Sequence, residues 1–422
     1  DDQRFDALGA AGNPKIHTPN LDRLCSEGVY FHQSTVVVPQ CSPVRASLLT
    51  GVVPHQNGWL SNQYQRPEAT GTKGLKGPFL PQLLQDAGYL TVLVGKWHLD
   101  VEPWESGFTD VRTWLPGGGG LYRGEPLAKG NSRKPHDNAD YTNIAFSKDA
   151  EEFLKSDAAK EKPFFMWLAL TCPHTPWNPN PPEIANLYEG KKSDDLLPPG
   201  FPEKIPHHNF LSYYKATSLA DLISGRIEKA ITEAGLADNT MFVFLGDNGF
   251  MMGQKGIGAK GAAGKVVPYE ASARTPLMIK GAGVKLKGKN EACVSSIDLP
   301  PTFLALAGAK VPDTFVGRDM SALLAGESGA DKNFNEAFVE FADNQSDRFG
   351  TKAYRSIRTA THKLIVWDNA DSKPELYDVA KDPLEDHNLY GTAEAKSIQD
   401  DLSSRLVAWL KRTKDDQFKW PR

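Results

Sequence analysis

The sequence has little cysteine, no long apolar run and no excess of positive charge. Four cysteines in 422 residues are too few and too scattered for a disulfide scaffold or a paired-cysteine metal site. No run approaches the roughly 18 apolar residues needed to cross a bilayer, so we expect no membrane span. The net charge of −4 provides no overall positive field, and we therefore expect no nucleic-acid partner.

The residues that are present predict a large α/β protein. Helices and strands alternate with short connections, which favours an α/β sandwich with a mostly parallel central sheet between helices. The expected helices cover residues 18–27, 80–87, 141–155, 211–234 and 393–411. The expected strands cover residues 89–94, 163–170, 240–245, 276–280, 354–359 and 363–367.

The texture of the sequence changes near residue 325. We expect a large domain over residues 1–325 and a smaller α+β subdomain over 326–422, with an antiparallel sheet and a terminal helix. Gly117–Gly120 and the proline-rich stretches 173–182 and 197–206 are predicted loops near a ligand. Three tryptophans in candidate rim loops could stack on a sugar ring or simply pack in the core. They are Trp104, Trp114 and Trp177.

Polar clusters follow several predicted strands, at the sheet edge where α/β proteins bind ligands. Cys41 lies just before a predicted helix that Ser42 can cap, and a helix N-terminus favours negative charge. Arg45, one turn further on, could bond a group at position 41. Alone, this pattern is equally that of a buried thiol before a helix.

Three other clusters end predicted strands. Lys96 and His98 alternate, so an extended turn would put them on one face, and His174 lies in a proline-rich loop. Asp247-Asn248 is first a turn sequence, but its oxygens also suit a hard cation, with Asp1 and Asp2 as further carboxylates. Each cluster has an ordinary explanation alone, whereas their common edge indicates a site.

Together these residues resemble the motifs of the type I sulfatases, a branch of the alkaline phosphatase superfamily. The matches run in family order over nearly the whole chain. They comprise Asp1-Asp2, the C-x-P-x-R sequence Cys41–Arg45, Gly95-Lys96-Trp97-His98, Pro173-His174-Thr175-Pro176, Gly246-Asp247-Asn248-Gly249, Lys265 to Glu270 with Arg274-Thr275-Pro276-Leu277, and Glu375–Asp378 with Asp382-Pro383. The family's strand before the first acidic pair has no counterpart, and we expect it to precede Asp1 in a longer chain.

The resemblance implies a formylglycine-dependent sulfatase. Cys41 would be oxidised to formylglycine by a formylglycine-generating enzyme, and one Ca²⁺ would be bound at this residue. The other implied ligands of the calcium ion are Asp1, Asp2, Asp247 and Asn248. A hydroxyl of the hydrated aldehyde would attack sulfur and leave a sulfated enzyme.

The resemblance also implies roles for the basic side chains. Arg45 and Lys96 would orient the formylglycine diol, and Lys96 and Lys265 would bind sulfate oxygens. His98 would take a proton from the second hydroxyl and so expel sulfate. His174 would protonate the leaving oxygen.

Alternatives remain at this level. A hydrolase of phosphonate monoesters or phosphodiesters would share the nucleophile, and a non-catalytic sulfoglycan-binding protein would share the fold. A two-zinc phosphatase is disfavoured because Asn248 is a poor zinc ligand. The expected substrate is a sulfated carbohydrate, trimmed from a chain end, with aryl sulfates as surrogates. We expect a bacterial periplasmic or secreted enzyme rather than a lysosomal one.

Overall fold

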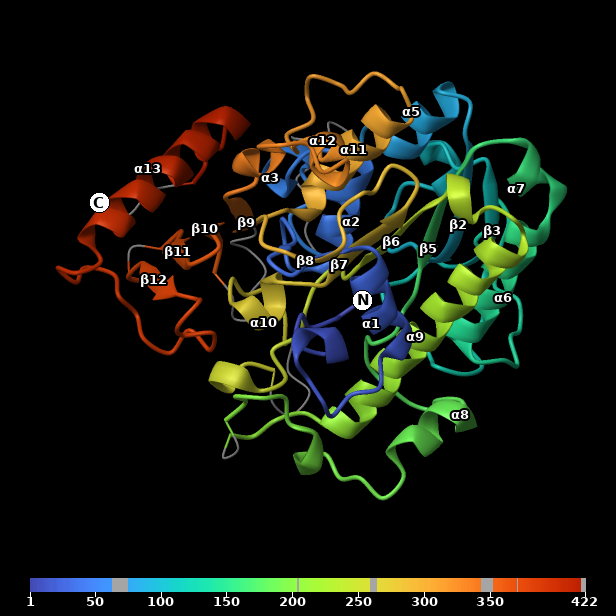
Figure 1. Cartoon of the computed structure of the whole chain (residues 1–422), viewed down its shortest axis with the longest axis horizontal. Coiled ribbons are helices and arrows are strands. Elements are labelled where there is room, and N and C mark those ends of the chain that lie inside the picture. Colours follow the sequence, from blue (N-terminus) through green and yellow to red (C-terminus); the bar gives the residue numbers. More distant parts are fainter. Residues whose placement is uncertain (63–74, 203–204, 259–263, 343–351, 370, 419–422) are drawn as a thin grey trace.

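The computed structural model describes residues 1–62, 75–202, 205–258, 264–342, 352–369 and 371–418 (Figure 1). The strand β2 (Leu90–Lys96) lies parallel between β3 (Asp110–Leu115) and β5 (Phe164–Ala169), and β4 (Ala128–Lys129) pairs antiparallel with β3. The apolar run 92–94 makes β2 a strand that is buried on both faces.

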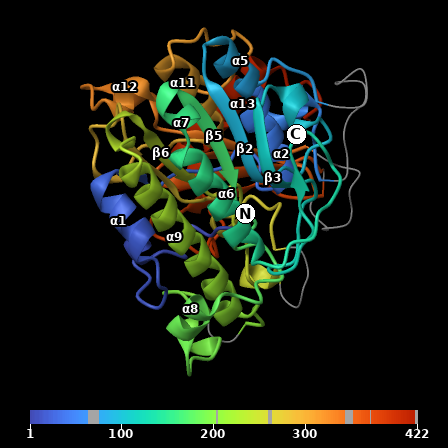
Figure 2. The same ribbon diagram turned by 90° about the vertical axis from the view of Figure 1, so that its right-hand side faces the viewer.

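A second sheet has the order β6-β7-β1-β8. Its strands are β6 (Met241–Leu245), β7 (Leu277–Gly281), β1 (Val29–Phe31) and β8 (Gly288–Asn290). Trp167 of β5 and Met241 of β6 pack against one apolar cluster, and the two strands are neighbours in Figures 1 and 2.

Strand β7 departs from the expected parallel pairing, because it runs antiparallel to both β6 and β1. Leu245, the last residue of β6, pairs with Leu277, the first residue of β7. The chain between β6 and β7 therefore leaves the sheet and returns to it at the same edge. The mixed α/β sandwich is confirmed, with parallel pairing concentrated in β3-β2-β5 and β1-β8.

Helices cover both faces of this core (Figure 2). Val92 and Val94 of β2 belong to a cluster with the helices α6 and α9, whereas Leu93 packs with residues of α2. The long helices are α1 (Pro19–Glu27), α2 (Cys41–Thr50), α5 (Leu80–Asp86), α6 (Thr142–Lys155), α9 (Phe210–Glu233) and α11 (Leu299–Leu306). Short helical turns are α3 (Pro54–Asn57), α7 (Asp157–Glu161), α8 (Pro182–Ala185), α10 (Glu270–Ala273) and α12 (Ser321–Leu324).

The C-terminal region forms its own antiparallel sheet, drawn in orange to red in Figure 1. The expected pairing of β10 with β11 is confirmed, and β9 and β12 extend the sheet on either side. Helix α13 (Lys396–Thr413) packs Leu402 and Leu406 against this sheet. The strands are β9 (Ala337–Phe341), β10 (Tyr354–Arg358), β11 (His362–Trp367) and β12 (Glu375–Asp378). The boundary at residue 325 stays a prediction.

Buried charges join this sheet to the main body in what we call the interface cluster, formed by Glu270, Arg358, Lys363 and Glu385. Lys363 Nζ lies 2.6 Å from Glu270 Oε1 and donates to Glu385 Oε1 at 2.9 Å. Arg358 donates to Glu270 at 2.9 Å. Lys363 also donates to the carbonyl of Pro268 at 3.0 Å, so the C-terminal sheet holds the segment that precedes α10.

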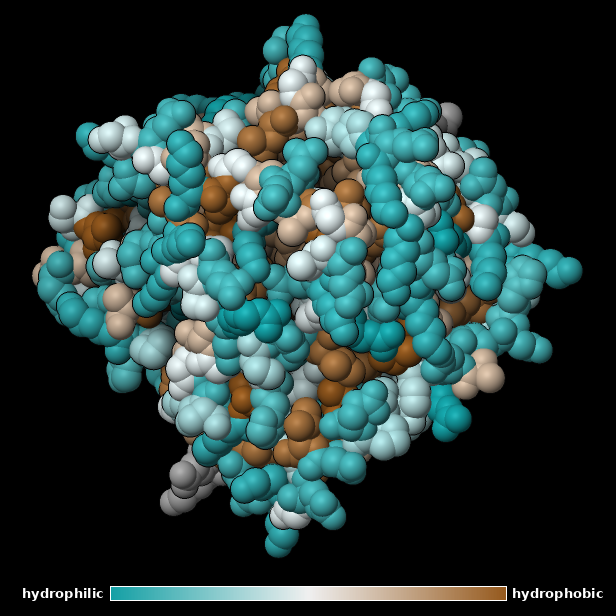
Figure 3. All heavy atoms as spheres, turned by 45° about the vertical axis from the view of Figure 1, so that its right-hand side comes forward, coloured by the Kyte–Doolittle hydropathy of each residue, from teal (hydrophilic) through white to brown (hydrophobic). Residues whose placement is uncertain are grey.

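The face seen in Figure 3 is predominantly polar, with hydrophobic atoms visible between the hydrophilic side chains. Within the described ranges, no helix combines the length and apolarity that a membrane crossing requires. For two of the three tryptophans the structure decides between stacking on a sugar and packing in the core. Trp114 lies buried within β3, and Trp177 packs against Tyr213 and Phe250, so both are core residues.

Candidate active site

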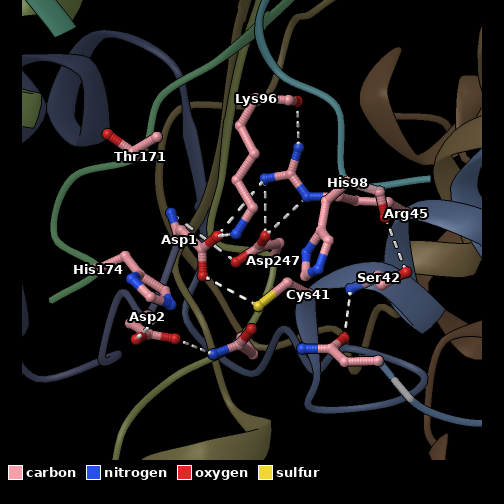
Figure 4. Close-up of polar contacts among 12 residues, drawn as sticks. Asp1, Asp2, Cys41, Ser42, Arg45, Lys96, His98, Thr171, His174 and Asp247 are labelled. Carbon is pink, nitrogen blue, oxygen red and sulfur yellow. Dashed lines mark hydrogen bonds and ion pairs between the residues drawn. The ribbon is translucent and has the colours of Figure 1, made fainter. Parts of the chain in front are cut away.

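The predicted site residues converge at one edge of the core (Figure 4). Lys96 is the last residue of β2, His174 follows β5, and Asp247 follows β6. These three strands end at the same side of the core, so the three side chains come together there. The acidic pair Asp1-Asp2 and the first turn of α2 meet them there. Candidate ligand atoms of Asp1, Asp2, Cys41 and His174 all lie within 4.8 Å of one another.

Cys41 is buried at the centre of this cluster, with 1% of its surface exposed. Its Sγ lies 3.4 Å from Asp1 Oδ1 and 2.8 Å from Lys265 Nζ. Burial alone would raise the pKa of the thiol, but the charges of Lys265 and Lys96 outweigh it and lower that pKa. Position 41 therefore favours a negatively charged group, as the sequence predicts.

The start of α2 lies two residues earlier than the prediction of a Ser42 cap. The helix begins at Cys41, and Gln40 takes the N-cap position, so Ser42 is not the cap. The Ser42 hydroxyl instead donates to the carbonyl of His98 at 2.8 Å and accepts from Trp59 Nε1 at 2.5 Å. The reason is proximity, since the turn after β2 passes beside the helix and offers a carbonyl. Ser42 thereby ties the backbone of His98 to Cys41.

Arg45 connects the helix to two strand ends. Its guanidinium donates to Asp247 Oδ2 at 2.8 and 3.1 Å and to the carbonyl of Lys96 at 2.8 Å. It lies 3.9 Å from Asp1 Oδ2. In the protein as described, Arg45 therefore orients carboxylates and backbone around Cys41 rather than bonding the Cys41 side chain.

The two lysines pair with the N-terminal acidic residues. Lys96 Nζ forms a close ion pair with Asp1 Oδ2, and Lys265 Nζ donates to Asp2 Oδ1 at 2.7 Å. Burial would raise the pKa of Asp2, but Lys265 outweighs that effect and lowers it. Burial would likewise raise the pKa of Asp247, but the N-terminal ammonium and Arg45, which pairs with it at 2.8 Å, outweigh that effect and lower it. Asp2 and Asp247 thus stay ionised.

Two buried oxygens in the cluster lack hydrogen-bond partners. They are Asp247 Oδ1 and Asn248 Oδ1, and both atoms are inaccessible to solvent. Asn248 is fixed by its amide nitrogen, which donates to Asp2 Oδ1 at 2.7 Å. A buried acceptor without a partner costs about 1 to 3 kcal/mol, a cost that a bound cation would remove. The oxygen donors of Asp1, Asp2, Asp247 and Asn248 fit a hard divalent ion such as Ca²⁺.

The two histidines border the cluster with different support. His174 Nε2 lies 4.0 Å from Asp2 Oδ2, and its Nδ1 contacts the carbonyl of Thr175 at 2.8 Å. Burial lowers the pKa of His174 to about 4, although Asp2 raises it. Burial and the charge of Lys96 lower the pKa of His98 to about 2. Both rings are therefore neutral near pH 7 in the unliganded protein.

Sequence reasoning missed the residues that hold these side chains in place. Asn143 on α6 accepts hydrogen bonds from the backbone of Thr171 at 2.8 Å and of Cys172 at 3.3 Å, which shapes the loop that carries His174. Trp59 holds Ser42 by donating a hydrogen bond from its Nε1 to the Ser42 hydroxyl at 2.5 Å. Neither residue lies in a motif, and the contacts join segments far apart in the sequence, so the sequence contained no pattern that could have revealed them.

Comparisons with known proteins agree with this geometry. The sulfatase family model matches residues 1–309, and the C-terminal model of N-sulphoglucosamine sulphohydrolase matches residues 258–412. The chain belongs to the sulfatase family. It is a sulfuric ester hydrolase with the alkaline phosphatase-like fold.

Several relatives cover almost the whole chain. An ulvan-active sulfatase of Formosa agariphila is 29% identical, over 99% of this chain and 81% of its own length. An N-acetylglucosamine-6-O-sulfatase of Bacteroides thetaiotaomicron is 27% identical, over 99% and 86% respectively. A solved structure in complex with its substrate D-glucosamine-2-N,6-O-disulfate superposes with a TM-score of 0.81 at 26% identity, covering 99% of this chain and 97% of the other.

Proposed function

We propose that this protein hydrolyses a sulfate monoester of a carbohydrate, using a formylglycine formed from Cys41. The observation that carries the proposal is the position of Cys41 Sγ, 3.4 Å from Asp1 Oδ1 and 2.8 Å from Lys265 Nζ. In the mature enzyme the hydroxyls of the hydrated aldehyde would stand where this sulfur lies. These hydroxyls would lie beside Asp1 on one side and beside Lys265, which we propose binds sulfate, on the other.

We assign the calcium ion to the oxygens of Asp1, Asp2, Asp247 and Asn248, together with residue 41. The unpartnered oxygens of Asp247 and Asn248 support this assignment. The bound ion would supply Lewis-acid stabilisation of negative charge on the sulfate and the diol. Lys96 and Lys265, which pair with Asp1 and Asp2 in the unliganded protein, would then be free to bind sulfate oxygens.

The chain's own residues account for the proton transfers. One hydroxyl of the diol, already ionised because Lys265 and Lys96 favour negative charge at position 41, attacks sulfur. The S–O bond to the sugar breaks, and His174 gives a proton to the departing oxygen. His174 must be protonated to do this, and the anionic sulfate would raise its pKa from the value of about 4 in the unliganded site. Neutral His98 then takes the proton of the second hydroxyl, so that sulfate leaves and the aldehyde is restored.

The relatives support a sulfated carbohydrate as the substrate. One is described as ulvan-active, another as an N-acetylglucosamine-6-O-sulfatase, and a third was solved with a disulfated glucosamine. We propose exo-action on a terminal residue and a periplasmic or secreted location in a bacterium. We also propose that a formylglycine-generating enzyme matures Cys41.

The test begins with mass spectrometry of the Cys41 peptide from protein purified from its natural source. The expected result is the mass of formylglycine or its hydrate. Sulfate release is then measured on a panel of sulfated monosaccharides and an aryl sulfate, with a phosphodiester and a phosphonate monoester as controls. A plain thiol would remove the proposed nucleophile, and faster cleavage of either control than of every sulfate would favour the phosphonate or phosphodiester hydrolase.

Calcium is tested apart from turnover. We expect added Ca²⁺ to raise the thermal unfolding temperature of metal-stripped protein, since the ion binds the folded state. Asn248→Ala should weaken this shift, whereas Asn369→Ala, at a half-buried position in the C-terminal subdomain away from the site, should keep it. Equal shifts in the two variants would contradict the assigned ligand set.

A further inference from the structure

One short loop contacts the backbone of both active-site histidines. The loop Pro116–Tyr122 follows β3 and contains the four glycines Gly117–Gly120. At its start, the carbonyl of Pro116 accepts a hydrogen bond from the backbone N–H of His98 at 3.2 Å. At its end, the buried Tyr122 donates from its hydroxyl to the carbonyl of His174 at 2.8 Å. The loop therefore spans the distance between the two histidines.

The glycines lie directly against the imidazole rings. A Cβ atom at Gly118 would fall 2.3 Å from Cε1, 2.4 Å from Nε2 and 2.8 Å from Nδ1 of His98. A Cβ atom at Gly119 would lie 3.2 Å from Cε1 of His174. Neither glycine has a φ in the left-handed region, so the backbone itself would accept another residue. Glycine is required at position 118 because the His98 ring occupies the space of a side chain.

The two rings differ in what else holds them. His174 has the contact from Nδ1 to the carbonyl of Thr175 at 2.8 Å. Within the described part of the chain, the His98 ring makes no hydrogen bond, and its Nδ1 is buried without a partner. An imidazole that lacks a hydrogen bond to fix its orientation depends on packing. For His98 that packing includes the backbone of Gly118.

We propose that Pro116, Gly118 and Tyr122, through the Pro116–Tyr122 loop, position the two histidines for the proton-transfer steps. Gly118 acts through the ring of His98, and Tyr122 acts through the backbone of His174. Through these contacts the loop fixes the positions of both imidazole rings relative to residue 41. This role rests on the proposed function, because it presumes that His98 serves the release of sulfate and His174 the release of the alcohol.

Gly118→Ala tests the contact with His98. The added methyl displaces the ring, and a misplaced base slows the second half-reaction, so we expect kcat to fall about 10- to 100-fold. Sulfated protein should accumulate during turnover, visible by intact mass as an added SO₃. Gly117→Ala is the matched control, because the nearest atom to its Cβ is the carbonyl oxygen of Gly119 at 4.0 Å. It should keep wild-type kcat and show no sulfated protein.

Tyr122→Phe tests the contact with His174. A phenolate leaves sulfur without a proton, whereas a sugar alcohol needs one. We therefore expect the variant to lose about 10-fold or more in kcat/KM on a sugar sulfate but little on 4-nitrophenyl sulfate. Tyr354→Phe is the control, since it removes a buried hydroxyl that has no partner, on the C-terminal sheet. Thermal unfolding of all variants identifies any that fail to fold.

The outcomes separate this role from the proposed function. Wild-type kcat in Gly118→Ala without sulfated protein, or an equal loss on both substrates in Tyr122→Phe, would overturn the positioning role while the sulfatase function stands. If Gly118→Ala were misfolded, the substrate dependence of Tyr122→Phe would decide. Wild-type protein that carries formylglycine but releases no sulfate from any ester would overturn the function and the role together.

Discussion

Two clusters of buried charge, the active-site cluster and the interface cluster, differ in whether all their buried polar atoms have hydrogen-bond partners. The active-site cluster and the interface cluster both pair carboxylates with lysine and arginine side chains out of contact with water. In the interface cluster, none of the four side chains has a buried polar atom without a partner, whereas the active site leaves Asp247 Oδ1 and Asn248 Oδ1 unpartnered. Buried charge alone therefore does not distinguish the two clusters. The unsatisfied acceptors beside residue 41 do, and they are the atoms that we assign to the cation.

The largest loss of activity is expected at Cys41, in the active-site cluster. Cys41→Ala removes the proposed nucleophile, so we expect sulfate release to fall by at least about 10⁴-fold. Unfolding should change little, because only the sulfur is lost from the side chain. Cys25→Ala, at another buried cysteine outside the site, serves as the control and should remain active. Multiple turnover by Cys41→Ala would exclude residue 41 as the nucleophile.

The next largest effect is expected at His98. His98→Ala removes the base of the second half-reaction, and we expect kcat to fall by about 10²- to 10⁴-fold. The first half-reaction should proceed, so a burst of alcohol and a sulfated protein should be detected by rapid mixing and mass spectrometry. The exposed His136→Ala is the control. Steady turnover at the wild-type rate, with no initial burst of alcohol, would show that another group takes this proton.

The interface cluster should respond through stability and not through a trapped intermediate. Lys363→Met leaves Glu270 and Glu385 buried without their shared cation, so we expect the free energy of unfolding to fall by about 3 to 5 kcal/mol. Urea denaturation measures this change. Lys373→Met removes an exposed lysine of the same subdomain and should have little effect. Equal stabilities would mean that the cluster contributes nothing to the fold.

A smaller effect, with a defined pH window, is expected at His55. Its Nδ1 lies 2.8 Å from Glu340 Oε2, its Nε2 lies 3.1 Å from the carbonyl of Thr413, and Asp415 and Arg355 are close by. Because acceptors face both ring nitrogens, the doubly protonated ring fits best. Burial alone would lower the pKa of His55, but Glu340 raises it above its usual value.

The sign of the His55 effect follows from that raised pKa. The stabilisation is complete below the unfolded-state pKa of about 6.5 and disappears as the pH rises through the folded-state pKa. Glu340 works in the opposite direction. Burial would raise its pKa, but His55 lowers it to about 2, so its contribution disappears as the pH falls from about 4.5 toward that value.

Urea unfolding of wild type and His55→Gln between pH 5 and 9 measures this contribution. We expect a difference of about 1 to 3 kcal/mol at pH 5.5 that shrinks toward high pH. A difference that is constant over the whole range would contradict a protonated His55.

The sequence predicted the positions of the site residues better than their contacts. The strand ends that carry Lys96, His174 and Asp247 follow from apolar runs bounded by polar turns, and the family motifs named the same residues. The antiparallel direction of β7 could not be predicted, because it depends on where a long excursion of the chain returns. The places of Trp114 and Trp177 stayed open because a tryptophan beside a loop looks the same in sequence whether it faces solvent or the core, where the structure puts both.

The bond from Lys363 to the carbonyl of Pro268 has a consequence for engineering the enzyme. It anchors the stretch that begins with Lys265, although Lys363 itself lies on β11, remote in sequence from every reacting group. A version shortened before β9 would keep all the residues that we propose to contact the ester yet lose the contact that anchors Lys265. Deletions and fusions should therefore spare the C-terminal sheet, because its loss would free the segment that carries Lys265.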